Sequence, residues 1–510
     1  MAGKQGIDWT TLWKKDDWMS VWIGFIIIIV FIAGLTFKLP SWRWMTDSAF
    51  EDKIGGWQKR VESVTKDATA KGDAAVATEA GTLKTALDAK DRQAIGAAAG
   101  KLEKTAASAA DKDVKKNADK LAKDVKGDAG ATAGKVFAGD NMTRCLYLLI
   151  GMWILGAIGL AFMGMSVGKF TAGFPIVFIL SALSFFVAGN TTVVYYGLEV
   201  VFWALIFGLI ISNTVGVPDW LKTAIKTEFF IKIGLVLLGA EVLFTTVAKV
   251  GAYGMLQAII VIFAVFYVCF WLAKKFGLDD EFASILGTAV SICGVSAAIA
   301  AGGAVKGDQR KVSHTISLVL LCAIPMLIFQ PLIAKWVNMA PAVAGAWIGG
   351  TIDTTGAVVA AGAIAGPQAM EVAVVVKMAQ NVLIGLAAFL LAIWFTFKGK
   401  EVTEKPTAME IWFRFPKFVV GFIAASVLFS FVLSDATVKT VTAITPAVRG
   451  WWFTLAFLCI GLETKFSELV SMGGGRPAGA FLIAQAFNII WTLIFAYLIF
   501  GGILFGLPKL

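Results

Sequence analysis

The sequence predicts an all-α polytopic membrane protein with about 13 transmembrane segments and one polar helical insert. Of its 510 residues, 58% are hydrophobic and only 16% are charged, whereas soluble domains carry about a quarter charged residues. Apolar stretches of membrane length recur along the chain, and one long polar stretch interrupts them near the N-terminus. The net charge of +10 fits Lys and Arg in cytoplasmic loops beside anionic lipid, and no nucleic-acid partner is expected.

The first 37 residues predict a cytoplasmic tail followed by a membrane anchor. An apolar run from Met19 to Phe37 follows Lys4, Lys14 and Lys15. The run is longer than the apolar region of a signal peptide, and no small-residue cleavage site follows it. The basic flank favours a cytoplasmic N-terminus.

Residues 38–141 form an Ala/Lys-rich insert of different composition. Sparse apolar residues at helical spacing, such as Leu83, Leu87 and Leu121, predict a small helical bundle or hairpin. A solvated, disordered spacer is the alternative. One preceding membrane crossing places the insert outside the cytoplasm, because long loops translocate largely regardless of charge.

Residues 142–172 predict an additional transmembrane segment, and residues 173–510 predict a transporter core. Apolar segments of this part of the chain are centred near Leu155, Leu180, Ala204, Leu238, Phe263, Val290, Leu320, Gly356, Gly385, Ala424, Leu458 and Ile490.

Two of these segments are built from small and polar residues and predict discontinuous helices. They cover residues 291–303 and 349–362, and the second contains Asp353. Backbone breaks at membrane depth only where protein or a water-filled cavity covers it. Paired Gly-interrupted segments indicate the binding site of a secondary transporter.

Free N–H groups at the start of a half-helix favour an anion. Asp353, an ionisable group inside a membrane segment, is the sharpest candidate for ion coupling. The alternatives are close helix packing by small residues, a structural ion pair for Asp353, and an interfacial location for the other charged candidates. The candidate substrate ligands are Ser291, Cys293, Gly294, Ser296, Gly350, Thr351, Thr354, Thr355 and Lys377, and the candidate ion-coupling groups are Asp353, Glu241 and Glu463.

An internal repeat joins two stretches at a constant offset of 222 residues. Because the second stretch lies seven segments after the first, with six between them, the two run in opposite directions through the membrane, which is typical of transporters with inverted repeats. Chance resemblance between Gly-rich membrane helices is the alternative. The matched pairs are Gly239 with Gly461, Glu241 with Glu463, Phe244 with Phe466 and Gly251 with Gly473.

Motifs for catalysis or metal binding are absent from the sequence. His314 is the one histidine, and the five cysteines are odd in number and lie in apolar stretches, so neither a metal site nor a disulfide framework is expected. No His-Glu-x-x-His, Ser/His/Asp or nucleotide-binding motif occurs. We therefore expect neither an enzyme nor a cofactor.

Several spaced motifs resemble the bacterial sulfate exporter family, from about Phe174 to the C-terminus. They are Ser291-Ile-Cys-Gly294, Lys311-Val312, Ile348-Gly-Gly-Thr351, Val358-Val-Ala-Ala-Gly362 and Val376-Lys-Met378.

That family in turn resembles, more distantly, the bile acid/sodium symporter fold, in which two discontinuous helices cross near the bilayer midplane. Two positions depart from the family pattern. This chain has Asp353-Thr354 where the family has His-Glu, and Glu241 where the family has an Arg. The substrate and coupling ion of the family therefore cannot be assigned directly to this chain.

The sequence thus predicts a multi-pass protein of the bacterial inner membrane that moves a small anion by alternating access. The resemblance implies a sulfate-like or organosulfur anion, coupling to H⁺ or Na⁺ fits the carboxylates, and a homodimer follows by analogy of fold. The alternative is a membrane scaffold or receptor that binds partners through the insert.

Overall fold

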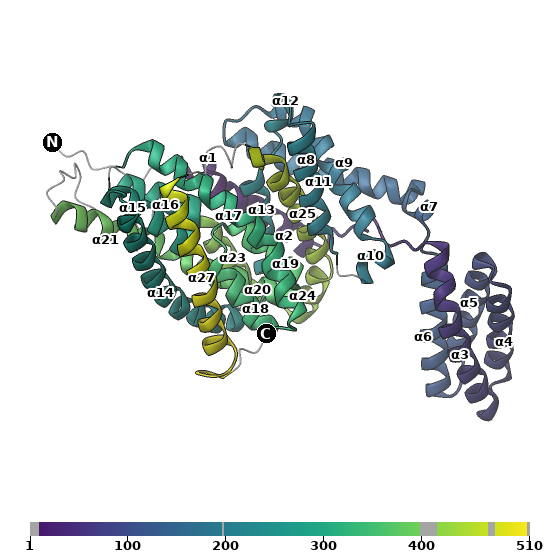
Figure 1. Cartoon of the computed structure of the whole chain (residues 1–510). Coiled ribbons are helices and arrows are strands. Elements are labelled where there is room, and N and C mark those ends of the chain that lie inside the picture. The colour runs from purple at the N-terminus through teal and green to yellow at the C-terminus, as the bar shows by residue number, and fades with distance from the viewer. Residues whose placement is uncertain (1–9, 196–197, 306, 398–415, 468–474, 507–510) are drawn as a thin grey trace. The chain divides into compact units, whose positions relative to one another are not determined.

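The computed structural model describes residues 10–195, 198–305, 307–397, 416–467 and 475–506, and it is helical throughout (Figure 1). Within these residues no strand forms, and the one β contact is an isolated bridge between Trp44 and Asn190. The predicted all-α class is confirmed for the described residues.

Eight of the described helices are long and apolar enough to cross a membrane, and three shorter apolar helices accompany them. Every predicted segment centre lies within a helix, but several of these helices are too short or too interrupted to count as full spans. The count of about 13 spans stays a prediction. The repeat position Gly473 lies outside the described residues.

The chain divides into two compact units. One unit contains residues 1–37, 152–181 and 201–510, and the other contains residues 38–151 and 182–200. Helices α8 (Gly139–Phe162) and α9 (Val167–Ala188) contribute to both units.

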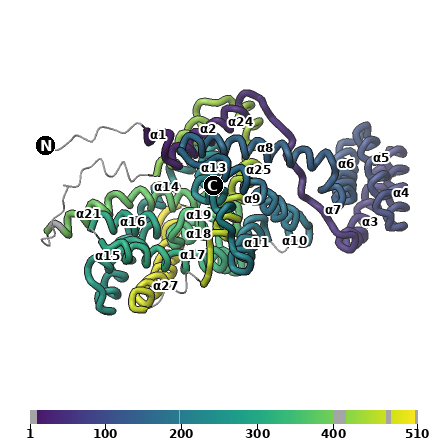
Figure 2. The backbone as a smooth tube through the Cα atoms, turned by 90° about the horizontal axis from the view of Figure 1, so that it is seen from above, coloured from purple at the N-terminus to yellow at the C-terminus, as the bar shows by residue number. Residues whose placement is uncertain are grey.

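In the smaller unit, four helices of the insert pack side by side, as both views show (Figures 1 and 2). Each helix begins at a Thr or Asp whose side chain accepts a hydrogen bond from a free backbone N–H of the first turn. Their inward faces carry fully buried Leu, Ile, Val and Ala, which let the helices approach closely. The helices are α3 (Asp47–Ala70), α4 (Ala74–Ala89), α5 (Arg92–Ala107) and α6 (Lys112–Ala129).

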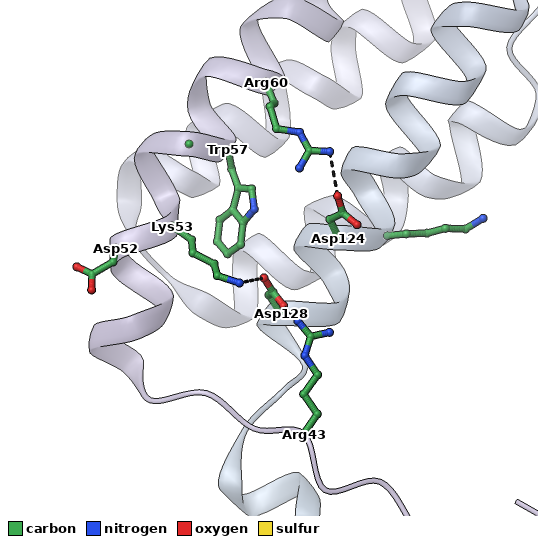
Figure 3. A pocket seen from close by; sticks show the side chains of 9 residues that line it. Arg43, Asp52, Lys53, Trp57, Arg60, Asp124 and Asp128 are labelled. Atoms are coloured by element: carbon green, nitrogen blue, oxygen red, sulfur yellow. Dashed lines mark hydrogen bonds and ion pairs between the residues drawn. The ribbon is translucent and has the colours of Figure 1, made fainter. Parts of the chain in front are cut away.

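Ion pairs link the first and last helices of this bundle along an open cleft of about 580 Å³. Arg43 and Lys53 both reach Asp128, whose side chain is 8% exposed, and Arg60 bonds Asp124 at 2.9 Å (Figure 3). The charges that line the cleft are therefore largely satisfied by one another.

Arg92 holds the chain ends of the bundle together. Its guanidinium donates to the carbonyl oxygens of Met45, Asp128, Ala129 and Ala131 at 2.7–3.2 Å. It also bonds Asp47 at 2.7 Å, and its side chain is only 15% exposed. One charged group therefore satisfies backbone acceptors at both the start and the end of the bundle.

We expect Arg92→Ala to destabilise the bundle by about 2–4 kcal/mol, because buried carbonyls lose their donor. Hydrogen–deuterium exchange of the full chain in micelles would show faster exchange in α5 and α6. Lys84→Ala is the control, since the Lys84–Glu62 pair is exposed and such pairs contribute little. Equal protection of α5 and α6 from exchange in both variants would contradict the stabilising role of Arg92.

In the larger unit, the N-terminal helix α2 (Asp16–Ile32) packs against α13 (Thr227–Gly239) and α23 (Lys417–Val427). Any side chain at Gly24 would meet Val236 within 2.6 Å, so the two backbones approach closely there. Helix α2 is thus part of the same packed unit as the core helices, and its role as a membrane anchor stays a prediction.

Helices α13 and α25 (Thr445–Glu463) also pack together. The Thr227 hydroxyl, at the start of α13, donates to Glu463 at the end of α25 at 2.9 Å. Glu241, just after α13, pairs with Arg449 near the start of α25. Because each start contacts the other's end, the two helices are antiparallel.

Candidate functional site

The first small-residue segment is an interrupted helix. It consists of α15 (Asp280–Thr288), a π-helical turn over Ala289–Cys293, and α16 (Gly294–Ala304). A π turn shifts the hydrogen-bond register and frees backbone groups, and such turns frequently mark functional sites. No side chain caps the first N–H groups of α16.

The second small-residue segment breaks completely between α18 (Pro341–Thr351) and α19 (Thr355–Ala365). Thr354 caps α19 by accepting from the Ala357 N–H at 3.3 Å. Asp353 lies in the break and is 1% exposed, and no described group hydrogen-bonds its Oδ2. The two breaks are adjacent, since a Cβ on Gly294 would lie 3.1 Å from the Cβ of Asp353.

Side chains of α20 (Pro367–Val382) bond the carbonyls that the two breaks set free. Lys377, 1% exposed, donates to the Ile292 carbonyl and to the Gln380 Oε1. Gln380 donates in turn to the carbonyls of Ser291 and Gly350, at 2.9 and 3.3 Å. One buried pair therefore links the first break to the second.

Helix α27 (Arg476–Phe500) supplies a second set of donors. Asn488 bonds the Val290 and Thr351 carbonyls at 3.1 and 3.4 Å, and Gln485 bonds Thr351 at 3.2 Å. Neither Gln485 nor Asn488 is among the predicted site residues, although an amide inside an apolar segment is a signal for such a role.

A cavity of about 330 Å³ lies beside the breaks. Its wall includes the first turns of both α16 and α19, so two helix N-termini face one space. Ser296 is exposed to it, and no hydrogen bond joins its hydroxyl to another described residue. The lining residues that carry polar groups are Thr227, Glu228, Lys232, Cys293, Ser296, Thr354, Thr355, Glu463 and Thr464.

The charged side of the cavity comes from α13 and α25. Lys232 bonds Asp16 and Asp17 of α2, both at 2.7 Å, and lies 3.6 Å from Glu228. Glu463 is exposed and accepts from the Thr227 hydroxyl at 2.9 Å. The cavity thus combines helix N-termini, one neutralised lysine and two carboxylates.

The structure sorts the predicted site residues into three groups. Cys293, Ser296, Thr354, Thr355 and Glu463 line the cavity. Glu241 lies away from it in a two-bond ion pair with Arg449, at 2.9 Å for each bond. The remaining candidates are buried at or between the breaks and do not line the cavity: Ser291, Gly294, Gly350, Thr351, Asp353 and Lys377.

Contacts between α13 and α25 recur at the 222-residue offset. Thr227 bonds Glu463, and the positions 222 residues away from them are Arg449 and Glu241, which also pair. Ser212 donates to the Thr464 carbonyl at 2.7 Å, at the end of α25.

At the opposite end, Ser426 donates to the Val242 carbonyl at 2.6 Å, after α13. The acceptors Val242 and Thr464 are again 222 residues apart, whereas the donors Ser212 and Ser426 are 214 residues apart.

A family described as Conserved hypothetical protein 698 matches residues 172–479. The chain belongs to this family. The match covers the cavity-lining helices from α13 to α25 but excludes α2 and the insert.

The relatives are named UPF0324 membrane proteins. One from Rhodopirellula baltica is 42% identical over 368 residues, which are 69% of this chain and 68% of the relative. One from Nitratidesulfovibrio vulgaris is 38% identical over 379 residues, 72% of this chain and 66% of the relative. The inner membrane protein YeiH of Salmonella typhi is 29% identical over 308 residues, 59% of this chain and 82% of the relative.

No solved structure matches the chain. The relatives named as inner membrane proteins and the eight long apolar helices make this chain a multi-pass inner-membrane protein.

We expect Gln380→Leu to lower the free energy of unfolding by roughly 2–4 kcal/mol, because two buried carbonyls and Lys377 lose a partner. Denaturation in detergent micelles measures the change. Gln368→Leu, an exposed position on the same helix, is the control and should unfold like the parent. Equal stability of the two variants would show that α20 does not hold the breaks.

Proposed function

We propose that the chain is a secondary transporter of a small anion, sulfate-like or organosulfur, that binds in the 330 Å³ cavity. The observation that carries the proposal is the convergence of two half-helix N-termini on that cavity. Aligned peptide dipoles give each N-terminus a partial positive charge, and the free N–H groups are donors for an oxyanion.

The lining and the size of the cavity support a small substrate. Its volume is at the lower end of the range for small-molecule sites. The hydroxyls of Ser296 and Thr355 lie in the first turns of α16 and α19, where they add donors beside the backbone N–H groups. The named sulfur anions come from the resemblance to the sulfate exporter family.

Alternating access would follow from an inverted repeat. The paired contacts at the 222-residue offset, together with the antiparallel α13 and α25, support such a repeat in a protein of about 13 membrane segments. In this arrangement the insert lies outside the cytoplasm. H⁺ or Na⁺ coupling would use a carboxylate of the site, and a homodimer is the proposed assembly.

A second candidate function is a scaffold or receptor in which the insert binds a partner. The insert has a buried core of its own and makes up most of one compact unit, which favours this candidate. Deletion of the insert distinguishes the scaffold from the transporter. If the insert serves a scaffold, the shortened protein should lose its partner while anion flux continues.

The transport test uses radiolabelled sulfate and the full chain in proteoliposomes. We expect Ser296→Asp to reduce sulfate flux at least about tenfold, because the new carboxylate occupies the positive end of α16 and repels the anion. The same charge suits a helix N-terminus, so the protein should stay folded. Thermal unfolding of the variant checks this point.

Ser313→Asp is the matched control. Ser313 is an exposed serine near the start of α17 (Gln309–Trp336), and it does not line the cavity. This variant should transport like the parent. A sulfate flux in Ser296→Asp equal to that of the parent would exclude the cavity as the anion site.

A further inference from the structure

We propose that Glu463 couples the anion to a proton: the carboxylate takes up a proton when the anion enters the cavity and releases it when the anion leaves. This inference rests on the proposed transport function and adds the coupling group and the coupling ion. It is carried by an asymmetry between two otherwise equivalent contacts of α13 and α25.

Glu241 and Glu463 occupy equivalent positions of the repeat but have chemically different partners. Glu241 receives two bonds at 2.9 Å from the Arg449 guanidinium, and the two side chains are 12% and 13% exposed. At the equivalent of Arg449, the chain has Thr227, which offers Glu463 only a neutral hydroxyl at 2.9 Å. No ion pair within 4 Å reaches Glu463 from the described part of the chain.

The charged groups near Glu463 do not replace the missing arginine. Lys226, Glu228 and Lys232 come from the start of α13, and Lys465 follows Glu463 in the chain. Lys232 is engaged by Asp16, Asp17 and Glu228. The lining residues from α16 and α19 carry no charged side chain.

An anion at the two helix N-termini would therefore share a small cavity with a carboxylate that forms no ion pair within 4 Å in the described part of the chain. Like charges that share a small cavity repel, and protonation of the carboxylate removes the repulsion. By linkage, a bound anion then raises the affinity of the site for a proton, and a bound proton raises its affinity for the anion by the same factor.

A single carboxylate with one hydroxyl partner suits a proton. One hydroxyl is the only side-chain group hydrogen-bonded to Glu463, and the described residues contain no group of three or more acidic, His or Cys side chains suited to a metal. A proton needs a single carboxylate oxygen. It would come from the water of the side to which the cavity is open and leave to the water of the other side.

Two assays on the full chain in proteoliposomes separate coupling from transport. The first measures exchange of labelled for unlabelled sulfate without a gradient. The second measures sulfate accumulation driven by a pH gradient at zero membrane potential. At a gradient of one pH unit, the parent should accumulate sulfate about tenfold per coupled proton.

Glu463→Gln should retain exchange and lose gradient-driven accumulation, because the amide cannot take up a proton. Glu371→Gln is the control, a half-buried carboxylate on α20 that does not line the cavity, and it should behave like the parent.

Thr227→Arg tests the asymmetry itself. It places a guanidinium at the position equivalent to Arg449, so Glu463 should stay ionised, and accumulation driven by the pH gradient should be lost.

Accumulation that persists in Glu463→Gln would overturn the inference and leave anion transport intact. Sulfate accumulation driven by a sodium gradient instead of a pH gradient would show that the coupling ion is not the proton. Loss of exchange in folded Glu463→Gln would assign this residue to anion binding rather than coupling. Absence of sulfate exchange in the parent would overturn the proposed function and this inference together.

Discussion

The satisfaction of backbone groups at two helix breaks is the constraint on which the rest of the structure depends. An unpaired peptide group away from water costs several kcal/mol, so a break is stable only if other groups bond it. Here the freed carbonyls of Ser291, Ile292 and Thr351 accept from side chains on α20 and α27. The first N–H groups of α16 instead have no side-chain cap and face the cavity. Backbone donors therefore remain available at the site while the carbonyls freed at the breaks do not, which supports the proposed anion site.

The N-terminal helix α2 affects the charge of the cavity wall, although it lies outside the region that the family shares. Lys232, the one lysine of the cavity wall, would be a strong anion ligand if it were free. Asp16 and Asp17 of α2 hold it at 2.7 Å, and α2 lies outside the family-matched region. The extra helix thus contributes to the charge of the cavity wall.

The sequence predicted the features that depend on local composition. The positions of the apolar segments, both breaks and the buried Asp353 follow from residue type along a single stretch. Features made by distant partners were not predictable. The Glu241–Arg449 pair joins residues 208 positions apart, and no local signal distinguishes Glu241 from Glu463.

The sequence also could not predict which residues line the cavity. Ser291 and Cys293 are two residues apart, yet only Cys293 lines the cavity, because the π turn decides which way each side chain points. In the insert, the capping residues Thr46, Asp73, Asp91 and Asp111 were a readable signal for four separate helices.

Proton coupling through one carboxylate would make the direction of transport depend on the charge of the substrate. A monovalent anion carried with one proton moves no net charge, so a pH gradient alone drives it, and a gradient of one pH unit supplies about 1.4 kcal/mol. A divalent anion such as sulfate, carried with one proton, still moves one negative charge. An inside-negative potential of about 100 mV then favours exit by about 2.3 kcal/mol, which exceeds the inward drive of the proton gradient. The same site would therefore export sulfate and accumulate a monovalent organosulfur anion, with the single unpaired Glu463 accounting for both outcomes.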